Sequence, residues 1–499
     1  MSVNIPGLIA VIVFYIVILV TGIWASRKSR KEEKKCTGNR SEVTMVGGRN
    51  IHVFIGIFTM TATWVGGGYI IGTAEAVYVP TQGLIWALGP LAYVINFVVG
   101  GTMSVILDIS SIHSILISAL VAIVYTLLGG LYSVAYTDVI QLTTMLISLG
   151  LCIPFVMKNP ASTDIRFTAV HELFQAPWIG KLELSDAGKW IDDLLIFALG
   201  GVCYQAFYQR VLSAASPCQA QVTCFSAAIF SVILAVPSVL IGATAVSTDW
   251  NQTSYGLPTP FERGEAAKIL PISLQHLCPP FISIAGIGAI AAAVMSSVDS
   301  AMLSSASLFA RNIYKNILRK TASDNEVVWV VRVSVLVVGL CGTGLAVTAD
   351  TVYGFWLISG DVIYTVLFSQ LICVLYFPST NSYGAAAGFV VGAVLRLLGG
   401  EPVLGIPPVI YFPYCRLIDG VYVQYFPFKT LVMLLSLITI MLGSFLASVL
   451  FNRGLLPERW DVFQVKKHND KILRRSHYEE TCLDDTLAVN EDSPVEKES

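Results

Sequence analysis

Charged side chains are scarce in this sequence of 499 residues, where Asp, Glu, Lys and Arg together make up 13%. Soluble domains carry roughly 25% of these residues. The formal net charge of −2 provides no basic excess that would favour a nucleic-acid partner. Hydrophobic residues account for 55% of the chain and its mean hydropathy is +0.70. These values exclude an ordinary soluble protein and indicate a chain that crosses a lipid bilayer many times.

The usual signatures of zinc sites and disulfide frameworks are also missing. The ten cysteines include no CxxC pair, and the six histidines show no HExxH spacing. A small-residue cleavage site is not evident after the first apolar run, 5–25, because a basic cluster follows at once. We therefore interpret this run as a membrane span and not as a cleavable signal peptide.

About twelve apolar runs have the length of about 20 residues that a helix needs to span a bilayer. They cover residues 5–25, 51–77, 84–107, 113–131, 139–156, 191–212, 222–246, 272–298, 328–347, 352–376, 384–398 and 431–451. We expect an all-α polytopic membrane protein. The stretches 157–190, 247–270 and 399–429 are expected to be loops, and the acidic end of the chain is expected to be disordered.

Basic residues predict which loops face the cytoplasm. The densest basic cluster lies at 27–40, and another lies at 311–320. Counting the apolar runs places these two clusters on opposite sides of the membrane, which conflicts with that rule. One more crossing before residue 251 would remove the conflict. Two runs meet with almost no loop near 100–113, so we expect a helix to be missing there.

The loop 247–270 contains the sequon Asn251-Gln252-Thr253. If the 311–320 cluster is cytoplasmic, simple alternation places this loop outside the cell. Asn251 is therefore the expected glycosylation site.

The stretch 59–75 interrupts an apolar run with three adjacent glycines, Gly66 to Gly68, directly after Trp64 and Val65. Each glycine weakens a helix by roughly 1 kcal/mol relative to alanine. Unwound backbone persists in a membrane only where protein or a wet cavity surrounds it. Broken helices of this kind hold ions and substrates in transporters. A glycine-rich contact between closely packed helices is the alternative interpretation.

The stretch 291–300 places two adjacent hydroxyls, Ser296 and Ser297, beside Asp299 at the end of an apolar run. Sodium is a hard cation that prefers oxygen ligands, and hydroxyls with main-chain carbonyls would supply them. Serine and alanine also pack helices closely without binding any ion.

The stretch 197–210 contains a second interruption, at Gly200 and Gly201, followed by Tyr204. Interrupted helices in both halves of a chain are typical of a transport site. Tyr204 is thus a candidate site residue, with an ordinary core position as the alternative.

Three charged residues in or beside the apolar runs have structural interpretations. Asp138 follows a Gly-Gly turn at 127–141 and is expected to cap the next helix. Arg210 is expected to extend to a membrane interface. Glu75 is expected to hold helices together, with ion sensing or gating as the alternative.

Several of these motifs together resemble the sodium/solute symporter family. They are GGLxSVAxTDxxQ at 129–141, the glycine-broken helix at 59–75 and AxxSS at 293–297. The stretches 64–69, 72–80 and 247–253 are similar to the choline-transporting branch of that family. The resemblance extends from residue 7 to about residue 463 and covers the acidic tail least.

This resemblance implies a LeuT-like inverted-repeat fold with two five-helix halves and extra helices at both ends. It also implies sodium-coupled, chloride-dependent choline uptake for acetylcholine synthesis, at the plasma membrane of cholinergic nerve endings. An enzymatic activity or a resident cofactor is not expected.

The resemblance further implies two sets of site residues. The expected sodium ligands are Ala62, Val65, Ala293, Ser296 and Ser297. The expected aromatic cage for choline consists of Trp64, Tyr93 and Tyr204, the last of which is a tryptophan in the family. Chloride cannot be assigned to residues of this sequence.

Choline transporters have thirteen spans, and about fifty residues near 101–109, including one whole helix, are expected to be absent here. A shortened isoform or an imperfect gene model would each explain the gap. The expected organisation is a membrane domain, 1–451, with a first repeat at 51–156 and a second at 191–376. A cytoplasmic tail, 452–499, is expected to be largely disordered.

Two other functions remain open. The chain is a symporter for another solute, such as a sugar or a carboxylate, or a transport-inactive subunit that binds a full-length partner. A sugar site would require several polar side chains near Trp64 and Tyr204, where the sequence offers mainly aromatics and glycine. A homo-oligomer is compatible with either function.

Overall fold

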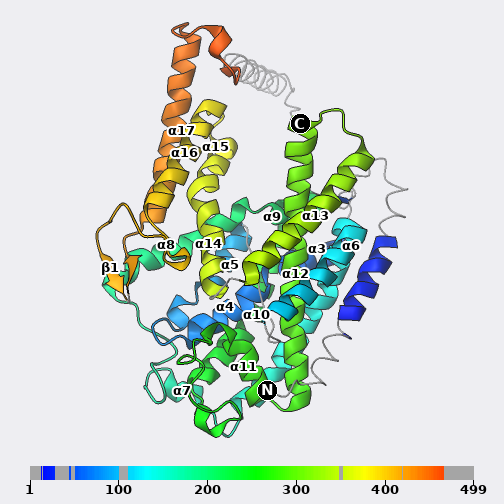
Figure 1. The fold of residues 1–499 in the computed structure, drawn as a ribbon, viewed down its shortest axis with the longest axis vertical. Helices are drawn as coiled ribbons and strands as arrows, with labels where there is room; N and C mark the ends of the chain where they lie inside the picture. The colour runs from blue at the N-terminus through cyan, green and yellow to red at the C-terminus, as the bar shows by residue number, and fades with distance from the viewer. Residues whose placement is uncertain are drawn as a thin grey trace, which may run out of the picture. The chain divides into compact units, whose positions relative to one another are not determined.

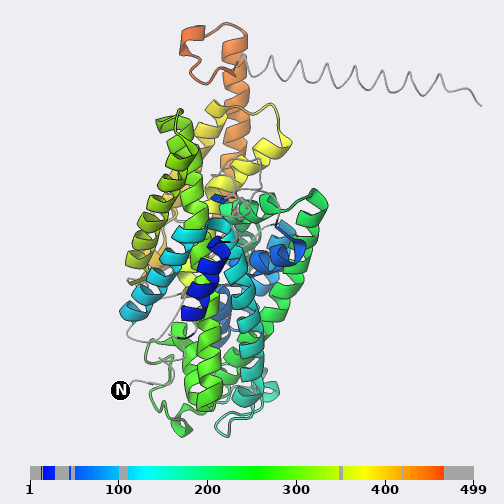
Figure 2. The ribbon, with the colours of Figure 1, turned by 90° about the vertical axis from the view of Figure 1, so that its right-hand side faces the viewer.

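The computed structural model describes residues 13, 15–27, 44–45, 51–99, 111–347, 352–418 and 420–465. The chain divides into two compact units, Met1–Asp361 and Val362–Ser499, and each is considered by itself. Helices dominate both units (Figures 1 and 2).

The first unit consists of packed helices in which α6 lies beside both α10 and α12. Its elements are α3 (Val53–Trp64), α4 (Gly67–Tyr78), α5 (Leu88–Val99), α6 (Ser111–Met157), α7 (Ile165–Thr168), α8 (Ala187–Leu199), α9 (Gln205–Ser213), α10 (Pro217–Val246), α11 (Ile269–Leu277), α12 (Pro280–Leu308), α13 (Asp324–Val347) and α14 (Val352–Val362). α14 ends one residue into the second unit. An apolar core in this unit is built around α4, with contributions from α5, α10, α11 and α12.

Six helices in the described residues are long and apolar enough to cross a membrane, and two bent helix pairs raise the number to eight. Three shorter apolar helices, Tyr15–Arg27, Leu84–Tyr93 and Ser382–Leu398, coincide with further expected spans. The helical, many-span architecture expected from the sequence is therefore confirmed. Within the part of the chain that the structure describes, this criterion does not reach the predicted number of about twelve spans.

Two expected boundaries differ from the structure. The run 272–298 is not one helix, because α11 ends at Leu277 and α12 starts at Pro280. Pro279 and Pro280 explain the break, since proline cannot continue a preceding helix but suits the first turn of a new one. The second difference lies in 127–141, where α6 bends at Gly130, whose φ of 56° glycine adopts without strain.

The ends of the helices define two opposite faces of the first unit. At one of them, a Cβ on Gly130 would lie 2.8 Å from the carbonyl oxygen of Thr44. Gln209 of α9 donates to the carbonyl oxygen of Met45 at 2.6 Å and to Ser307 Oγ at 3.3 Å. We call this end of the unit the Gly130 face.

The other end holds the segments that connect α6 to α8 and α10 to α11. Asn159 Nδ2 donates to the carbonyl oxygen of Leu277 at 2.9 Å. The backbone N–H of Asp249 donates to the carbonyl oxygen of Ala161, also at 2.9 Å. Asn251 is exposed in the same segment, and we call this end the Asn251 face.

These two faces bear on the conflict between the basic clusters. Residues 44–45, which follow the basic stretch 27–40 closely, lie at the Gly130 face. The helical residues that continue α12 beyond Ser307 enter the other basic stretch, 311–320. Residues 44–45 and the described basic stretch 311–320 thus belong to one face, and the sequon belongs to the other.

The directions of α5 and α6 show where the count of crossings fails. α5 starts near the Asn251 face, where Trp86 Nε1 donates to the carbonyl oxygen of Lys181 at 3.3 Å. It runs away from that face, and the first half of α6 ends at Gly130 on the opposite face. Both segments therefore run toward the Gly130 face. Residues 100–110 between them lie outside the described residues, and so does the expected missing helix near 101–109, which stays a prediction.

The second unit contains α15 (Ser369–Tyr376), α16 (Ser382–Leu398), α17 (Phe428–Asn452) and an antiparallel hairpin of β1 (Cys415–Ile418) and β2 (Val421–Gln424). The hairpin lies within the stretch 399–429, for which the sequence predicted only a loop. α16 packs closely on α17 because Gly384, Gly388 and Gly392 lie along the contact, where a Cβ on Gly384 would be 2.1 Å from Ser444 Oγ. Such small-residue stripes are common between membrane helices. Most of the expected tail, 452–499, lies outside the described residues.

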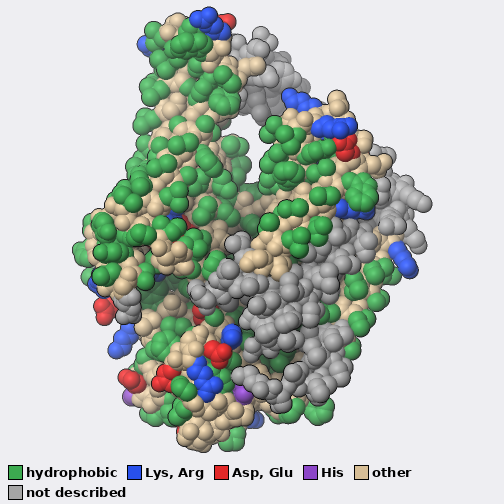
Figure 3. Space-filling model, viewed as in Figure 1, with side chains coloured by type: hydrophobic (Ala, Val, Ile, Leu, Met, Phe, Trp, Pro, Cys, Tyr) green, Lys and Arg blue, Asp and Glu red, His purple; other side chains and the backbone are tan. Residues whose placement is uncertain are grey.

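Hydrophobic side chains cover the outer surface along α13 (Figure 3). Its exposed residues include Trp329, Val333, Leu336, Val337 and Leu340. Charged side chains gather instead around the loops near α7 and α11 (Figures 1 and 3). An apolar helix surface of this kind suits contact with lipid.

Candidate substrate and ion site

The glycine-rich stretch forms a break between two helices, α3 and α4, which meet at an angle of 47°. α3 ends at Trp64, and Val65 and Gly66 have non-helical backbone angles before α4 starts at Gly67. A Cβ on Gly66 would lie 1.6 Å from Ser297 Oγ. Glycine is required here because its backbone lies against the Ser297 side chain and leaves no space for a Cβ. Its φ of −92° would suit any residue.

Oxygen atoms from α3 and α12 meet beside this break. Ser296 Oγ lies 2.9 Å from the carbonyl oxygens of both Ala62 and Ala293. Ser297 Oγ lies 3.3 Å from the same Ala293 oxygen. All five expected sodium ligands are buried. One of them, Val65, is the first residue of the break. Hydroxyl and carbonyl oxygens fit the preference of sodium for hard ligands.

The three expected cage residues are also neighbours. The ring centroid of Trp64 lies 6.0 Å from that of Tyr93 and 5.9 Å from that of Tyr204, in edge-to-face contacts. Phe207 adds a third such contact at 6.1 Å. A cation bound to a ring face lies within about 6 Å of the ring centroid, so rings this close leave little room between them.

The aromatic cluster extends to residues that the sequence did not indicate. Tyr69 stacks on Tyr93 at 4.7 Å, and Trp356 Nε1 donates to Tyr93 Oη at 3.0 Å. Tyr69 Oη donates to the backbone oxygen of Ser231 at 2.8 Å, which fixes the Tyr69 ring. Trp356 lies far from the other site residues in sequence, and only its position in an apolar run could have suggested it.

The second glycine interruption also forms a break, as the sequence predicted. α8 continues as a 3₁₀ turn, η4 (Gly200–Cys203), and α9 begins after Tyr204 with a bend of 49°. The extended backbone of Tyr204, with φ −74° and ψ 126°, ends the 3₁₀ turn. Tyr204 thus lies at the second break, and its ring contacts Trp64 at the first.

A buried polar network lies on the Gly130-face side of the two breaks. Arg210 Nη2 lies 3.7 Å from Asp138 Oδ2 and donates to Ser300 Oγ at 2.5 Å. Thr59 donates to the same Asp138 oxygen, and Thr63 lies 3.2 Å from Ser300 Oγ. The network joins α3, α6, α9 and α12.

Two predictions are wrong at this network. Asp138 does not cap a helix, because it lies within α6, eight residues after the bend at Gly130. Arg210 does not extend to an interface, because only 2% of it is exposed. In both cases a partner distant in sequence makes burial of the charge possible, and no local pattern reveals such a partner.

Glu75 fits the interpretation of a residue that connects helices. The Glu75 carboxylate accepts a hydrogen bond from the backbone N–H of Tyr353 in α14 at 3.2 Å, and Glu75 is 6% exposed. Asn251 lies in the short helical turn Trp250–Gln252 and is exposed, as a glycosylated asparagine must be.

Among solved structures, the chain resembles one described as the substrate-bound outward-open state of a Na⁺-coupled sialic acid symporter that reveals a novel Na⁺ site. The TM-score is 0.62 at 16% sequence identity, and the match covers 88% of this chain and 98% of the other. This likeness shows the fold, which is the LeuT-like arrangement expected from the sequence.

Curated relatives are similar to this chain over almost its whole length. It is 46% identical to the human High affinity choline transporter 1 over 546 residues, with 99% of this chain and 92% of the relative covered. For the Torpedo marmorata protein of that name, identity is 45% over 552 residues, with coverages of 99% and 93%. A sodium/proline symporter of Salmonella typhimurium is 29% identical over 290 residues, covering 55% of this chain and 54% of that protein.

The model of the sodium:solute symporter family matches residues 91–392, which include the second break and the hydroxyl pair of α12. That match covers more than half of the chain, and the near-full-length relatives agree with it. This protein, a multi-pass membrane transporter and not an enzyme, belongs to the sodium:solute symporter family.

Proposed function

We propose that this chain is a sodium-coupled choline symporter of the plasma membrane. The observation that carries the proposal is the meeting of an aromatic cluster and a cluster of oxygen atoms at one helix break. Trp64 belongs to the aromatic cluster, and Ala62, two residues earlier, supplies one of the oxygens. The relatives of about 45% identity are named as choline transporters, which supports this choice of substrate.

The chemistry of choline suits the aromatic cluster. Its quaternary nitrogen has no N–H to donate, so aromatic faces are its natural receptor, each adding about 0.5–2 kcal/mol. Trp64, Tyr93 and Tyr204 are the proposed cage. A sugar would need several hydrogen-bonding side chains, and the rings around Trp64 are those of tyrosine and phenylalanine.

Sodium is proposed to bind between the first break and α12. Its ligands would be main-chain oxygens of Ala62, Val65 and Ala293 and the hydroxyls of Ser296 and Ser297. An ion held there joins α3 to α12, so it favours a conformation in which these helices are close. Coupling follows if choline favours that same conformation.

The finer assignments follow from this proposal. The membrane domain would comprise 1–451, with repeats at 51–156 and 191–376 and a cytoplasmic tail at 452–499. The Asn251 face would be extracellular and carry the glycan. We also propose chloride dependence, a role in acetylcholine synthesis, and a location in cholinergic nerve endings and their vesicles. A homo-oligomer is compatible with this function.

A second candidate function has its own support, which is the apparent loss of a helix. The alignment with the Torpedo relative spans 552 positions, more than the 499 residues of this chain, so the chain has gaps relative to that protein. α5 and the first half of α6 also run toward the same face. A shortened chain of this kind could be inactive and bind a full-length partner.

Radiolabelled choline uptake distinguishes the two functions. The chain would be expressed as it is and with the corresponding segment of a full-length relative inserted between residues 100 and 110, which we call the helix-restored chain. Uptake would be measured in sodium medium and after replacement of sodium, with surface biotinylation to correct for expression.

We expect sodium-dependent choline uptake by the helix-restored chain. Uptake by the unmodified chain as well would establish that it is itself a symporter. Uptake by the restored chain alone, with co-precipitation of the unmodified chain by a full-length relative, would establish the second function. Absence of choline uptake by both forms at normal surface levels would contradict the proposed substrate.

A further inference from the structure

Two cysteine thiols meet at the Asn251 face, outside the proposed transport site. Cys152 is buried near the end of α6, and its Sγ lies 3.6 Å from the carbonyl oxygen of Ile282 in the first turn of α12. Cys278 lies between α11 and α12 and is partly exposed. Because Cys278 precedes Ile282 by only four residues, it lies at the same end of α12 as Cys152, and each thiol shifts the pKa of the other.

The backbone around the two thiols is held in place by contacts of its own. Asn159, just beyond α6, donates to the carbonyl oxygen of Leu277, the residue before Cys278, at 2.9 Å. A Cβ on Gly286 of α12 would lie 2.9 Å from Cys152 Sγ, which shows how closely α6 packs on α12. The segments that carry the two thiols are therefore held against each other by packing and are not loose loops.

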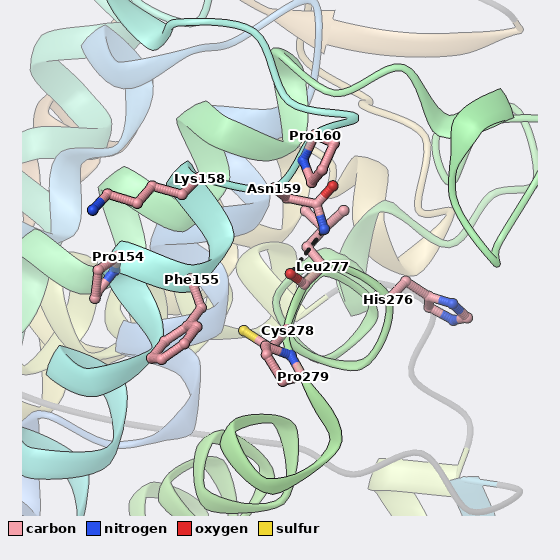
Figure 4. A pocket seen from close by; sticks show the side chains of 9 residues that line it. All are labelled: Pro154, Phe155, Lys158, Asn159, Pro160, His276, Leu277, Cys278 and Pro279. Atoms are coloured by element: carbon pink, nitrogen blue, oxygen red, sulfur yellow. Dashed lines mark hydrogen bonds between the residues drawn. The ribbon is translucent and has the colours of Figure 1, made fainter.

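Cys278 also lines a cavity of about 470 Å³ between the end of α6 and the start of α12. Its sulfur points toward Phe155 of α6, and Lys158 and His276 lie at the sides (Figure 4). Phe155 and Lys158 are exposed, so the cavity borders the surface. A small thiol reagent can reach Cys278 from this cavity, whereas Cys152 is buried in the core.

We propose that Cys152 and Cys278 are a redox-active pair that forms an intramolecular disulfide and thereby links α6 to the start of α12. All cysteines of the described residues are free thiols in the structure. The Asn251 face is the proposed extracellular side, where conditions are oxidising and disulfides persist. The link would connect α6 to the helix that carries Ser296 and Ser297.

The reaction can be written with an aromatic disulfide, 2,2′-dithiodipyridine, as the oxidant. The Cys278 thiolate attacks the reagent, which forms a Cys278–pyridyl mixed disulfide and releases one thiopyridine. Cys152 then loses its proton and attacks the Cys278 sulfur, which releases the second thiopyridine and forms the protein disulfide. Two thiols are oxidised and one reagent disulfide is reduced to two thiopyridine molecules.

The hydrogen bond with Cys152 and burial raise the pKa of the Cys278 thiol above its ordinary value. Only the thiolate is nucleophilic. The first step is therefore expected to accelerate as pH rises above 7, which sets the conditions of the test.

The test uses the purified full chain at mildly alkaline pH with a limiting amount of dithiodipyridine. Remaining thiols are blocked with N-ethylmaleimide, and peptides are identified by mass spectrometry without reduction. Wild type is compared with Cys152→Ser and Cys152→Ala. Cys224→Ser on α10 is the matched control, because Cys224 is also partly exposed and free.

Wild type and Cys224→Ser are expected to give a peptide pair cross-linked through Cys152 and Cys278. Both Cys152 variants are expected to retain the pyridyl group on Cys278. A stable pyridyl adduct on Cys278 in wild type, or Cys278 recovered only as its maleimide adduct, would overturn the proposal. This readout does not involve uptake, so it stands apart from the test of choline transport.

Discussion

The two helix breaks contact α12 in different ways. At the first, between α3 and α4, the backbone itself approaches α12, and a Cβ on Gly66 would lie 1.6 Å from Ser297 Oγ. At the second, between α8 and α9, the contact is made by a long side chain, with Arg210 Nη2 2.5 Å from Ser300 Oγ. The bends themselves are nearly equal, at 47° and 49°.

Similar bends thus give the site two different kinds of group. The first break presents carbonyl oxygens at fixed positions, which suits coordination of a small cation. The second presents the Tyr204 ring and the Arg210 charge, which can move by rotation about side-chain bonds. The close contact at the first break leaves no space for a methyl group on Gly66. The contacts at the second break are lost only when the charge of Arg210 or the ring of Tyr204 is removed.

The largest effect is expected where the second break meets α6 and α12. Arg210→Gln would leave the buried Asp138 without its cationic partner, and breaking a buried ion pair costs about 3–5 kcal/mol. Thermal unfolding of the purified chain should show a strong loss of stability. Arg319→Gln is the control, because Arg319 pairs with Glu326 while 60% exposed and such pairs contribute about 0–1 kcal/mol.

A double variant sharpens this prediction. Asp138→Asn combined with Arg210→Gln removes both charges, so the loss of stability should be smaller than the sum of the two single losses. Strict additivity would contradict the inference that these two side chains stabilise the second break as a pair.

Most of the site could be predicted from motifs, because its elements are local in sequence. Gly66 to Gly68 predict the first break, and Gly200 and Gly201 predict the second. The structure confirms both breaks. The hydroxyls of Ser296 and Ser297 were expected beside the first break through the family resemblance, and they lie there.

The parts of the site that the sequence did not predict depend on contacts between residues that are distant in sequence. Trp356 joins the aromatic cluster by a hydrogen bond to Tyr93, 263 residues away. Asp138 was interpreted as a local helix cap because its partner Arg210 lies on another helix. Periodicity and turn chemistry report on neighbours along the chain, so they cannot reveal such pairs.

The next effect is expected at the first break. Gly66→Ala would place a methyl group against Ser297, and overpacking of this kind costs about 1–3 kcal/mol. We expect lower thermal stability and loss of sodium-dependent uptake by the helix-restored chain. Gly288→Ala on α12, where a Cβ would meet no atom within 4 Å, should leave both unchanged. Normal uptake by Gly66→Ala would show that the backbone contact is not needed for transport.

A smaller effect is expected from the oxygens that the first break shares with α12. Ser296→Ala with Ser297→Ala removes two proposed sodium ligands but retains the helix. The sodium concentration for half-maximal uptake should rise about tenfold or more, which corresponds to about 1.4 kcal/mol. Ser283→Ala is the control, because Ser283 is also buried on α12 and lies near its start. An unchanged sodium curve would remove the pair from the site.

The smallest effect is expected from the ring at the second break. Tyr204→Trp offers choline a larger aromatic face, and tryptophan is the strongest cation–π partner. Choline affinity of the helix-restored chain should rise by less than about tenfold, whereas sodium dependence should stay as it was. Trp64→Ala, which removes a ring at the first break, should instead weaken choline uptake at normal surface level. If Tyr204→Trp altered the sodium curve and not the choline curve, the assignment of Tyr204 to the choline cage would be wrong. A change in choline affinity alone would support it, because the side chain of the second break can be exchanged without disturbing the oxygens of the first.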